Sequence, residues 1–162
     1  MALWRRRRWG RGPHDAVAVA EADAALGVAL DGVAALVHQQ AAQGFVPVII
    51  ISARTDLETR LQALGVPLAC LTNKPTAFAE QLLSLKGLRT HFAHVFGGDA
   101  FARKKPDPLP LLKTCEALGT DPSTTLMVGD SSNDAQAATA AGCGVVLVTY
   151  GYNHGHPIAE VP

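Results

Sequence analysis

The sequence predicts an α/β fold in which a parallel β-sheet carries helices on both faces, a three-layer doubly wound (Rossmann-like) arrangement. Two observations support this prediction. Short apolar runs alternate along the chain with segments whose apolar residues recur at helical spacing. The apolar runs are continuous, which is typical of strands buried on both faces of a parallel sheet. A chain of 162 residues is long enough for one domain with a sizeable core.

The predicted elements are clearest from residue 45 onward. Apolar runs at Phe45–Ile51 and Val66–Leu71 flank a helix pattern at Asp56–Leu64, which ends at Gly65. Further along, the pattern predicts helices at 76–85, 109–118 and 133–141 and strands at 94–97, 125–128 and 145–149. Gly142 directly follows the last of these helices, as expected at a helix end.

The first 53 residues differ from the rest, and we predict an atypical N-terminal segment there, followed by the main domain at residues 54–162. The segment contains the basic run Arg5–Arg8 and then a low-complexity Ala/Val/Gly stretch. Propensity favours a helix at Ala16–Leu30, with a weak strand at Ala16–Ala20 as the alternative. We expect the arginine run to be a disordered basic tail rather than a nucleic-acid-binding patch.

Composition argues for a folded globular protein and against several functional classes. Hydrophobic residues make up 48% of the chain, charged residues 17%, and the formal net charge is zero, which favours neither disorder nor a nucleic-acid partner. The run Phe45–Ile51 is too short to cross a membrane, and no uninterrupted apolar segment of a signal peptide follows the arginines. The cysteines, Cys70, Cys115 and Cys143, lack CxxC spacing and are predicted to be buried free thiols, so we expect a cytoplasmic protein.

Polar residues with related chemistry follow three of the predicted strands. Thr72 and Asn73 follow one strand, and Lys105 lies in the loop after the next. Asp130 and Asp134 follow a third strand. Ligands bind at the carboxyl ends of parallel strands; a hydroxyl, backbone amides and an ammonium suit a phosphate, whereas a carboxylate pair suits Mg²⁺. The sequence therefore predicts a phosphate and magnesium site.

Each of these residues also has a purely structural interpretation. Thr72 alone could be a helix N-cap, with Pro75 in the first turn. Lys105 alone could be a solvated loop lysine, and Asp130 with Asp134 could form the turn and cap at a helix start. The order of the three groups, each at a predicted strand end, favours the ligand site.

These residues resemble three of the four motifs of the haloacid dehalogenase superfamily. Thr72 matches the second motif, Lys105 in Lys-Pro-Asp-Pro the third, and Gly129-Asp130 with Asp134 the fourth. Longer matches resemble the bacterial phosphoglycolate phosphatases, at residues 71–75, 97–99, 103–108, 128–134 and 148–153. The resemblance covers roughly residues 57–155 and implies a haloacid dehalogenase-like core.

The resemblance also implies an activity, the hydrolysis of a small phosphorylated metabolite with 2-phosphoglycolate as the favoured substrate. In that family an aspartate attacks the phosphate monoester, and water hydrolyses the resulting aspartyl-phosphate. The resemblance implies that Asp130 ligates Mg²⁺ with Asp134 in support, and that Lys105 steadies nucleophile and phosphate. It implies that Thr72 and Asn73 donate to the phosphoryl oxygens. No nucleic-acid or membrane partner is expected, and the sequence does not indicate an oligomeric state.

The family's first motif, an apolar strand ending in Asp-x-Asp-Gly-Thr, is not found in this sequence. Partial matches at Val19–Ala24 and Val28–Val33 have glutamate or Ala29 where the nucleophile belongs, and we interpret them as accidental. We therefore expect a core that is incomplete at both ends, in which residues 1–53 do not correspond to the family's start. The alternative function is an inactive fragment, or a phosphate- and magnesium-binding module without a nucleophile.

Overall fold

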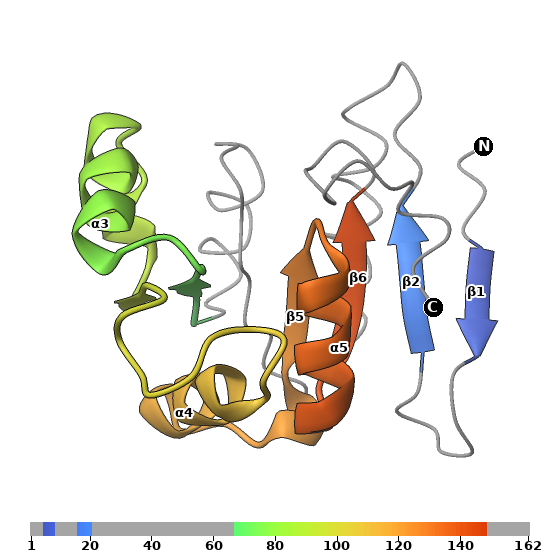
Figure 1. Cartoon of the computed structure of the whole chain (residues 1–162). Coiled ribbons are helices and arrows are strands. Elements are labelled where there is room, and N and C mark those ends of the chain that lie inside the picture. Colours follow the sequence, from blue (N-terminus) through green and yellow to red (C-terminus); the bar gives the residue numbers. More distant parts are fainter. Residues whose placement is uncertain (1–4, 9–15, 21–66, 149–162) are drawn as a thin grey trace.

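The computed structural model describes residues 5–8, 16–20 and 67–148 (Figure 1). The strands are β1 (Arg5–Arg8), β2 (Ala16–Ala20), β3 (Ala69–Leu71), β4 (His94–Phe96), β5 (Leu126–Gly129) and β6 (Gly144–Val148). The helices are α3 (Thr76–Leu85), α4 (Leu109–Leu118) and α5 (Ser132–Ala141), with short 3-10 helices η1 (Arg89–His91) and η2 (Pro122–Thr124). The elements predicted at Phe45–Ile51 and Asp56–Leu64 lie outside the described residues.

The described strands form two sheets. The larger has the order β1-β2-β6-β5, and the smaller pairs β3 with β4. Strands β2, β6 and β5 are parallel, as are β3 and β4, whereas β1 runs antiparallel to β2. Figure 1 shows β5, β6 and β2 side by side with their carboxyl ends at one edge. Parallel strands connected through helices confirm the predicted α/β class.

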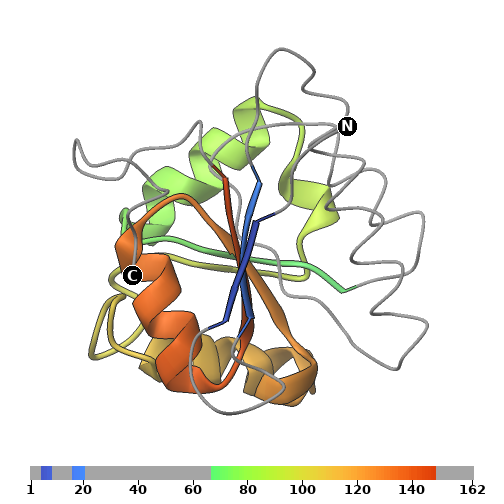
Figure 2. The ribbon, with the colours of Figure 1, turned by 90° about the vertical axis from the view of Figure 1, so that its right-hand side faces the viewer.

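The helices join the two sheets into one hydrophobic core. Helix α5 packs on β5 and β6, and α4 contacts α5 as well as β3 and β4; Figure 2 shows the larger sheet nearly edge-on with α5 beside it. The buried cluster draws on both sheets and both helices: Leu71, Leu111, Cys115, Met127, Ala135, Ala137, Ala138, Cys143, Val145 and Leu147. The carboxyl ends of β3 and β5 are therefore held over the same core.

The three α-helices agree closely with the prediction. Helices α3 and α4 have the predicted bounds, and α5 begins one residue earlier than expected. Helices α4 and α5 end at Gly119 and Gly142, whose φ angles of 67° and 80° lie in the left-handed region that favours glycine. In the described ranges, no helix is long and apolar enough to cross a membrane.

Two expectations for the N-terminal segment were wrong. Residues Ala16–Ala20 form strand β2, so the favoured helix is not observed there and the alternative strand is. Arg5–Arg8 form strand β1, paired with β2, instead of a disordered tail. The reason is tertiary: β2 has a partner strand on each side, and inter-strand pairing outweighs a weak intrinsic helix propensity.

Candidate functional site

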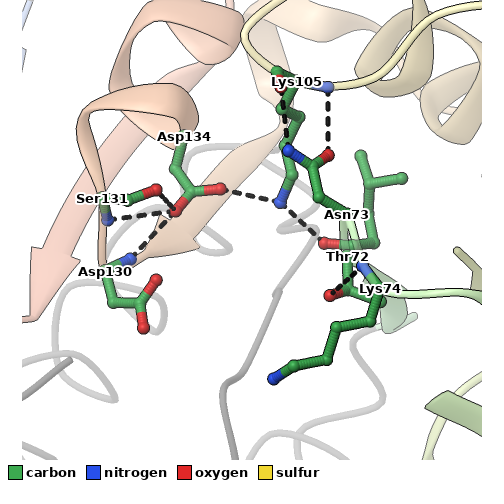
Figure 3. A network of polar contacts seen from close by, with 8 residues as sticks. Thr72, Asn73, Lys74, Lys105, Asp130, Ser131 and Asp134 are labelled. Carbon is green, nitrogen blue, oxygen red and sulfur yellow. Dashed lines mark hydrogen bonds and ion pairs between the residues drawn. The ribbon is translucent and has the colours of Figure 1, made fainter. Parts of the chain in front are cut away.

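Lys105 lies at the centre of a polar network between the carboxyl ends of β3 and β5 (Figure 3). Its Nζ donates to the carbonyl oxygen of Leu71, the last residue of β3, at 2.8 Å, and to Oδ1 of Asp134 at 2.7 Å. The side chains of Lys105 and Asp134 are both 6% exposed, so the interpretation of Lys105 as a solvated loop residue is wrong. A buried ion pair is tolerated when both partners are satisfied, and this pair fixes the ammonium between two strand ends.

Asp134 closes the start of helix α5. Its Oδ2 accepts from the N–H groups of Asp130 and Ser131, each at 3.1 Å, and from the Ser131 hydroxyl at 2.7 Å. Ser131 and Asp134 also form a reciprocal capping box. Because Oδ1 binds Lys105, both carboxylate oxygens of Asp134 have partners within the protein. The cap interpretation of Asp134 is therefore observed, together with an ion pair that the sequence did not predict.

Gly129 lets the chain pass closely over Asp134. A Cβ at Gly129 would lie 2.4 Å from Cβ and 2.5 Å from Cγ of Asp134, closer than real atoms approach. The next residue, Asp130, is half-buried, and Figure 3 shows its carboxylate turned away from Asp134. The turn thus presents one carboxylate outward while the other is held inside.

Asn73 holds the backbone of Lys105. Its Oδ1 accepts from the Lys105 N–H at 3.1 Å, and its Nδ2 donates to the Lys105 carbonyl oxygen at 2.8 Å. This reciprocal pair links residues 32 positions apart. The amide side chain of Asn73 is therefore bound to Lys105 in this structure, which defines a positioning contact that sequence reasoning missed.

Thr72 forms a tight turn at the end of β3. Its Oγ1 accepts from the Lys74 N–H at 3.2 Å, an arrangement that leaves the hydroxyl proton able to donate elsewhere. Helix α3 begins only after Pro75, so the interpretation of Thr72 as its N-cap is wrong. The structure thus brings Thr72, Asn73 and Lys105 together, from two separate loops.

Ser131 is a further member of the polar network, and it was not among the residues singled out from the sequence. Its N–H and hydroxyl both bind Asp134, so it orients the carboxylate that receives Lys105. A signal was present, because serine followed three residues later by an acid is the capping-box pattern. Reading that pattern would have placed the helix start at Ser132, where the structure has it.

The three cysteines are buried and free, as predicted. Cys70 precedes Leu71 in β3 and is the cysteine nearest along the chain to Thr72. Burial raises the pKa of its thiol to about 11. Cys70 is therefore a neutral thiol near pH 7, which argues against it as a nucleophile because only the thiolate attacks.

Metal binding here would depend on few protein ligands. Among the described residues, no group of three or more His, Cys, Asp or Glu side chains is placed to hold an ion. A hard cation such as Mg²⁺ keeps several waters and needs only one or two carboxylates, a demand that the half-buried Asp130 fits. The arrangement can therefore combine an ammonium and a hydroxyl that bind an anion with a carboxylate that binds a cation beside it.

The end of β2 lies apart from these groups. Strand β6 separates β2 from β5, so their carboxyl ends are about 10 Å apart, twice the usual inter-strand spacing. The acidic residues of the partial motifs, Glu21, Asp23 and Asp31, lie outside the described residues. Within the described part of the chain, the carboxylate that meets Lys105 is Asp134.

Known protein families and relatives agree on one superfamily. The model of the haloacid dehalogenase-like hydrolases matches residues 14–142. A phosphoglycolate phosphatase of Thiobacillus denitrificans is 49% identical over 100 residues, which are 62% of this chain and 44% of the relative. The Escherichia coli phosphoglycolate phosphatase is 52% identical over 98 residues, covering 60% and 39%. The chain thus spans less than half the length of the curated relatives it matches.

Solved structures give the same picture of the fold. A predicted phosphoglycolate phosphatase from Haemophilus somnus superposes with a TM-score of 0.62 at 42% identity, over 64% of this chain and 46% of that one. CbbY from Rhodobacter sphaeroides, solved in complex with phosphate, has a TM-score of 0.58 at 28% identity, over 65% and 48%. Both likenesses support the α/β architecture described above.

Proposed function

Since this chain belongs to the haloacid dehalogenase-like hydrolase family, we propose that it binds and hydrolyses a small phosphate monoester, with 2-phosphoglycolate as the favoured substrate. The observation that carries the proposal is the ammonium of Lys105, buried and fixed between the carboxyl ends of β3 and β5. The names of the relatives that are about half identical over their matched residues support the choice of substrate.

The protein's own groups have separate tasks in this proposal. Lys105 contributes a charge-assisted hydrogen bond to a phosphoryl oxygen, which is roughly twice as strong as a neutral one. Thr72 donates its hydroxyl proton to a second oxygen. Asn73 holds Lys105 by its backbone and offers its own N–H at the end of β3. Donors fixed before the substrate arrives cost no reorganisation during the reaction.

Asp130 is the proposed ligand of Mg²⁺, and Asp134 supports it from inside the turn. The fit rests on the chemistry of the donors: a half-buried carboxylate beside a phosphate supplies hard oxygen ligands. When bound, the ion would neutralise charge on the phosphate. Asp134 keeps the Asp130 backbone in place through the hydrogen bond at 3.1 Å.

Hydrolysis by the family's mechanism requires an aspartate that attacks phosphorus and displaces the substrate's alcohol, and water then cleaves the resulting acyl phosphate into the free aspartate and inorganic phosphate. Asp134 is unsuited to that task because the protein occupies both of its oxygens. We propose that the nucleophile is instead a carboxylate outside the described residues. We place the protein in the cytoplasm, where its three free thiols are stable.

The second candidate is a phosphate- and magnesium-binding module without catalysis. The observation that favours it is the separation of β2 from β5 by a whole strand, which puts the carboxyl ends of these two strands about 10 Å apart. This candidate shares the anion site with the first one. The two differ only in whether a reactive aspartate is present.

Phosphate release from 2-phosphoglycolate with Mg²⁺ tests the first candidate. We expect the wild-type chain to release phosphate. The variants Asp130→Asn and Thr72→Val, purified in parallel, should release much less or none. Loss of turnover in Glu21→Gln or Asp31→Asn would identify the nucleophile. Stabilisation by phosphate and Mg²⁺ without turnover, and without stabilisation by beryllofluoride, would select the binding module. A melting temperature that phosphate and Mg²⁺ leave unchanged would contradict both.

A further inference from the structure

The turn after β4 docks onto the turn that carries Thr72 and Asn73. Asp99 Oδ1 accepts from the N–H of Thr76 at 2.8 Å and from its hydroxyl at 2.5 Å. The Thr76 Oγ1 in turn accepts from the N–H of Gly97 at 3.0 Å. Thr76 is the first residue of α3, and the residue before it, Pro75, makes no side-chain cap. Asp99 therefore caps α3 from 23 positions further along the chain.

Backbone contacts reinforce this docking on both sides. The Gly98 N–H donates to the Lys74 carbonyl oxygen at 2.7 Å, and the Thr72 N–H donates to the Phe96 carbonyl oxygen at 3.0 Å. A Cβ at Gly97 would lie 2.2 Å from the Thr76 nitrogen, and one at Gly98 would lie 2.4 Å from the Asn73 carbonyl oxygen. Only glycine allows the two backbones to approach this closely.

The turn Thr72–Lys74 is largely exposed, so burial does little to hold it in place. Asn73 and Lys74 are exposed and Thr72 is half-buried, so a hydrophobic contribution to their position is small. Asn73 nevertheless has to meet both the N–H and the carbonyl of Lys105. The position of the Lys105 backbone thus depends on a surface turn that Gly98 binds at Lys74 and that Asp99 and Gly97 hold from the next residues of the chain, at Thr76.

We propose that Asp99 is a positioning residue of the phosphate site: it fixes the turn Thr72–Lys74 and, through Asn73, the backbone of Lys105, without touching the substrate. This rests on the proposed function of the site as a phosphate-binding one. The carboxylate is well suited to the task because it sits at the start of α3, where the helix dipole and the Thr76 N–H, from which it accepts a hydrogen bond, favour a negative group. The Thr76 contacts also hold the pKa of Asp99 below its usual range, so the carboxylate is charged at neutral pH.

The chain offers a matched control in Asp121. Its Oδ1 accepts from the N–H and the hydroxyl of Ser123 at 2.8 and 2.5 Å, the same pair of contacts that Asp99 makes with Thr76. Asp121 is also exposed, but it caps η2, which precedes β5 and thus lies at the opposite end of that strand from Asp130. Asp99→Ala and Asp121→Ala therefore remove equal contacts at different places.

Two measurements on the full chain test the proposal. Titration with inorganic phosphate and Mg²⁺ should give an affinity about fivefold weaker in Asp99→Ala than in wild type, the effect of losing about one hydrogen bond, and an unchanged affinity in Asp121→Ala. Amide hydrogen exchange at Asn73, Lys74 and Lys105 should become faster in Asp99→Ala only. Asp99→Asn keeps an oxygen acceptor, so its phosphate affinity and its exchange rates should lie between those of Asp99→Ala and wild type.

The outcomes separate this inference from the proposed function. Equal phosphate affinities and equal exchange rates in the two alanine variants would overturn the positioning role of Asp99. A wild-type chain that binds no phosphate would overturn the proposed function instead. In that case the exchange rates alone decide whether Asp99 fixes the turn and Lys105.

Discussion

The two turns that build the site are held in opposite ways. The turn after β5 is held from within, because Oδ2 of the buried Asp134 accepts from backbone and hydroxyl groups three and four positions away, while only its Oδ1 reaches a distant residue, Lys105. The turn after β3 is exposed and is held by remote residues: Lys105 binds Asn73 in the turn from 32 positions away, and Asp99 binds Thr76, just after the turn, from 23 positions away. A local, buried turn contributes to the stability of the whole fold, whereas a remotely held surface turn contributes mainly to the geometry of the site.

The largest effect is expected from the local turn. Asp134→Ala removes the acceptor of three hydrogen bonds and leaves the Lys105 ammonium buried beside the Leu71 carbonyl alone. An uncompensated buried charge of this kind costs about 3–5 kcal/mol of unfolding free energy. Urea denaturation followed by circular dichroism measures it, with Asp121→Ala as the exposed control. A loss below about 1 kcal/mol would erase the distinction between the turns.

Two glycines extend the comparison to steric contacts. Gly129→Ala drives a methyl group into Asp134, and Gly98→Ala drives one into the Asn73 carbonyl oxygen. We expect each to cost about 1–3 kcal/mol, as overpacking does, with Gly129→Ala the larger because its neighbour is buried. Gly144→Ala is the control, since its nearest neighbour, Leu126 Cδ1, would be 3.4 Å away. Thermal melts of the three variants measure the order, and a reversed order of the first two would contradict the comparison.

A smaller loss is expected from the remotely held turn. Asn73→Ala removes both hydrogen bonds to the Lys105 backbone, each with a net value of about 0.5–1.5 kcal/mol. Because the position is partly exposed, water can replace these hydrogen bonds, so we expect a loss of about 1 kcal/mol of unfolding free energy in all, measured by urea denaturation. The phosphate affinity should fall more clearly than stability does. An unchanged phosphate affinity would show that Lys105 keeps its place without Asn73.

The smallest effect concerns pH. Hydrogen bonds from Thr76 lower the pKa of Asp99 below the ordinary value of 3.8, and those from Ser123 lower the pKa of Asp121 in the same direction. A folded-state pKa below the unfolded one means that this stabilisation is present above about pH 3.8 and is lost as the pH falls through the folded-state pKa. Carboxyl chemical shifts followed by NMR should show both midpoints below 3.8. A midpoint for Asp99 at or above that value would mean that the Thr76 contacts are absent in solution.

Local patterns account for the parts that the sequence predicted well. Helices α3 and α4 followed from apolar spacing, and Gly119 and Gly142 end α4 and α5 where glycine favours a left-handed residue. The grouping of Thr72, Lys105 and Asp130 followed from one topological rule, that ligands gather at the carboxyl ends of parallel strands. These features depend on neighbours in the chain or on the sheet as a whole.

What could not be predicted depends on contacts between distant residues. Strand β2 forms because β6 and β1 flank it, although its alanines favour a helix on their own. Nothing near Asn73 in the sequence indicates that its amide would meet the backbone of Lys105. The capping role of Asp99 is equally invisible, because an aspartate after Gly-Gly reads as a turn residue until its partner in α3 is known.

The two bonds of the Lys105 ammonium also set a limit on what it can give to a ligand. A tetrahedral ammonium has three N–H groups, and Leu71 and Asp134 take two of them. One N–H donor therefore remains for a ligand, and the other two N–H groups fix its direction. Lys105 can therefore offer an incoming anion one hydrogen bond in one direction. This restricts the position that the anion can take, in addition to supplying positive charge.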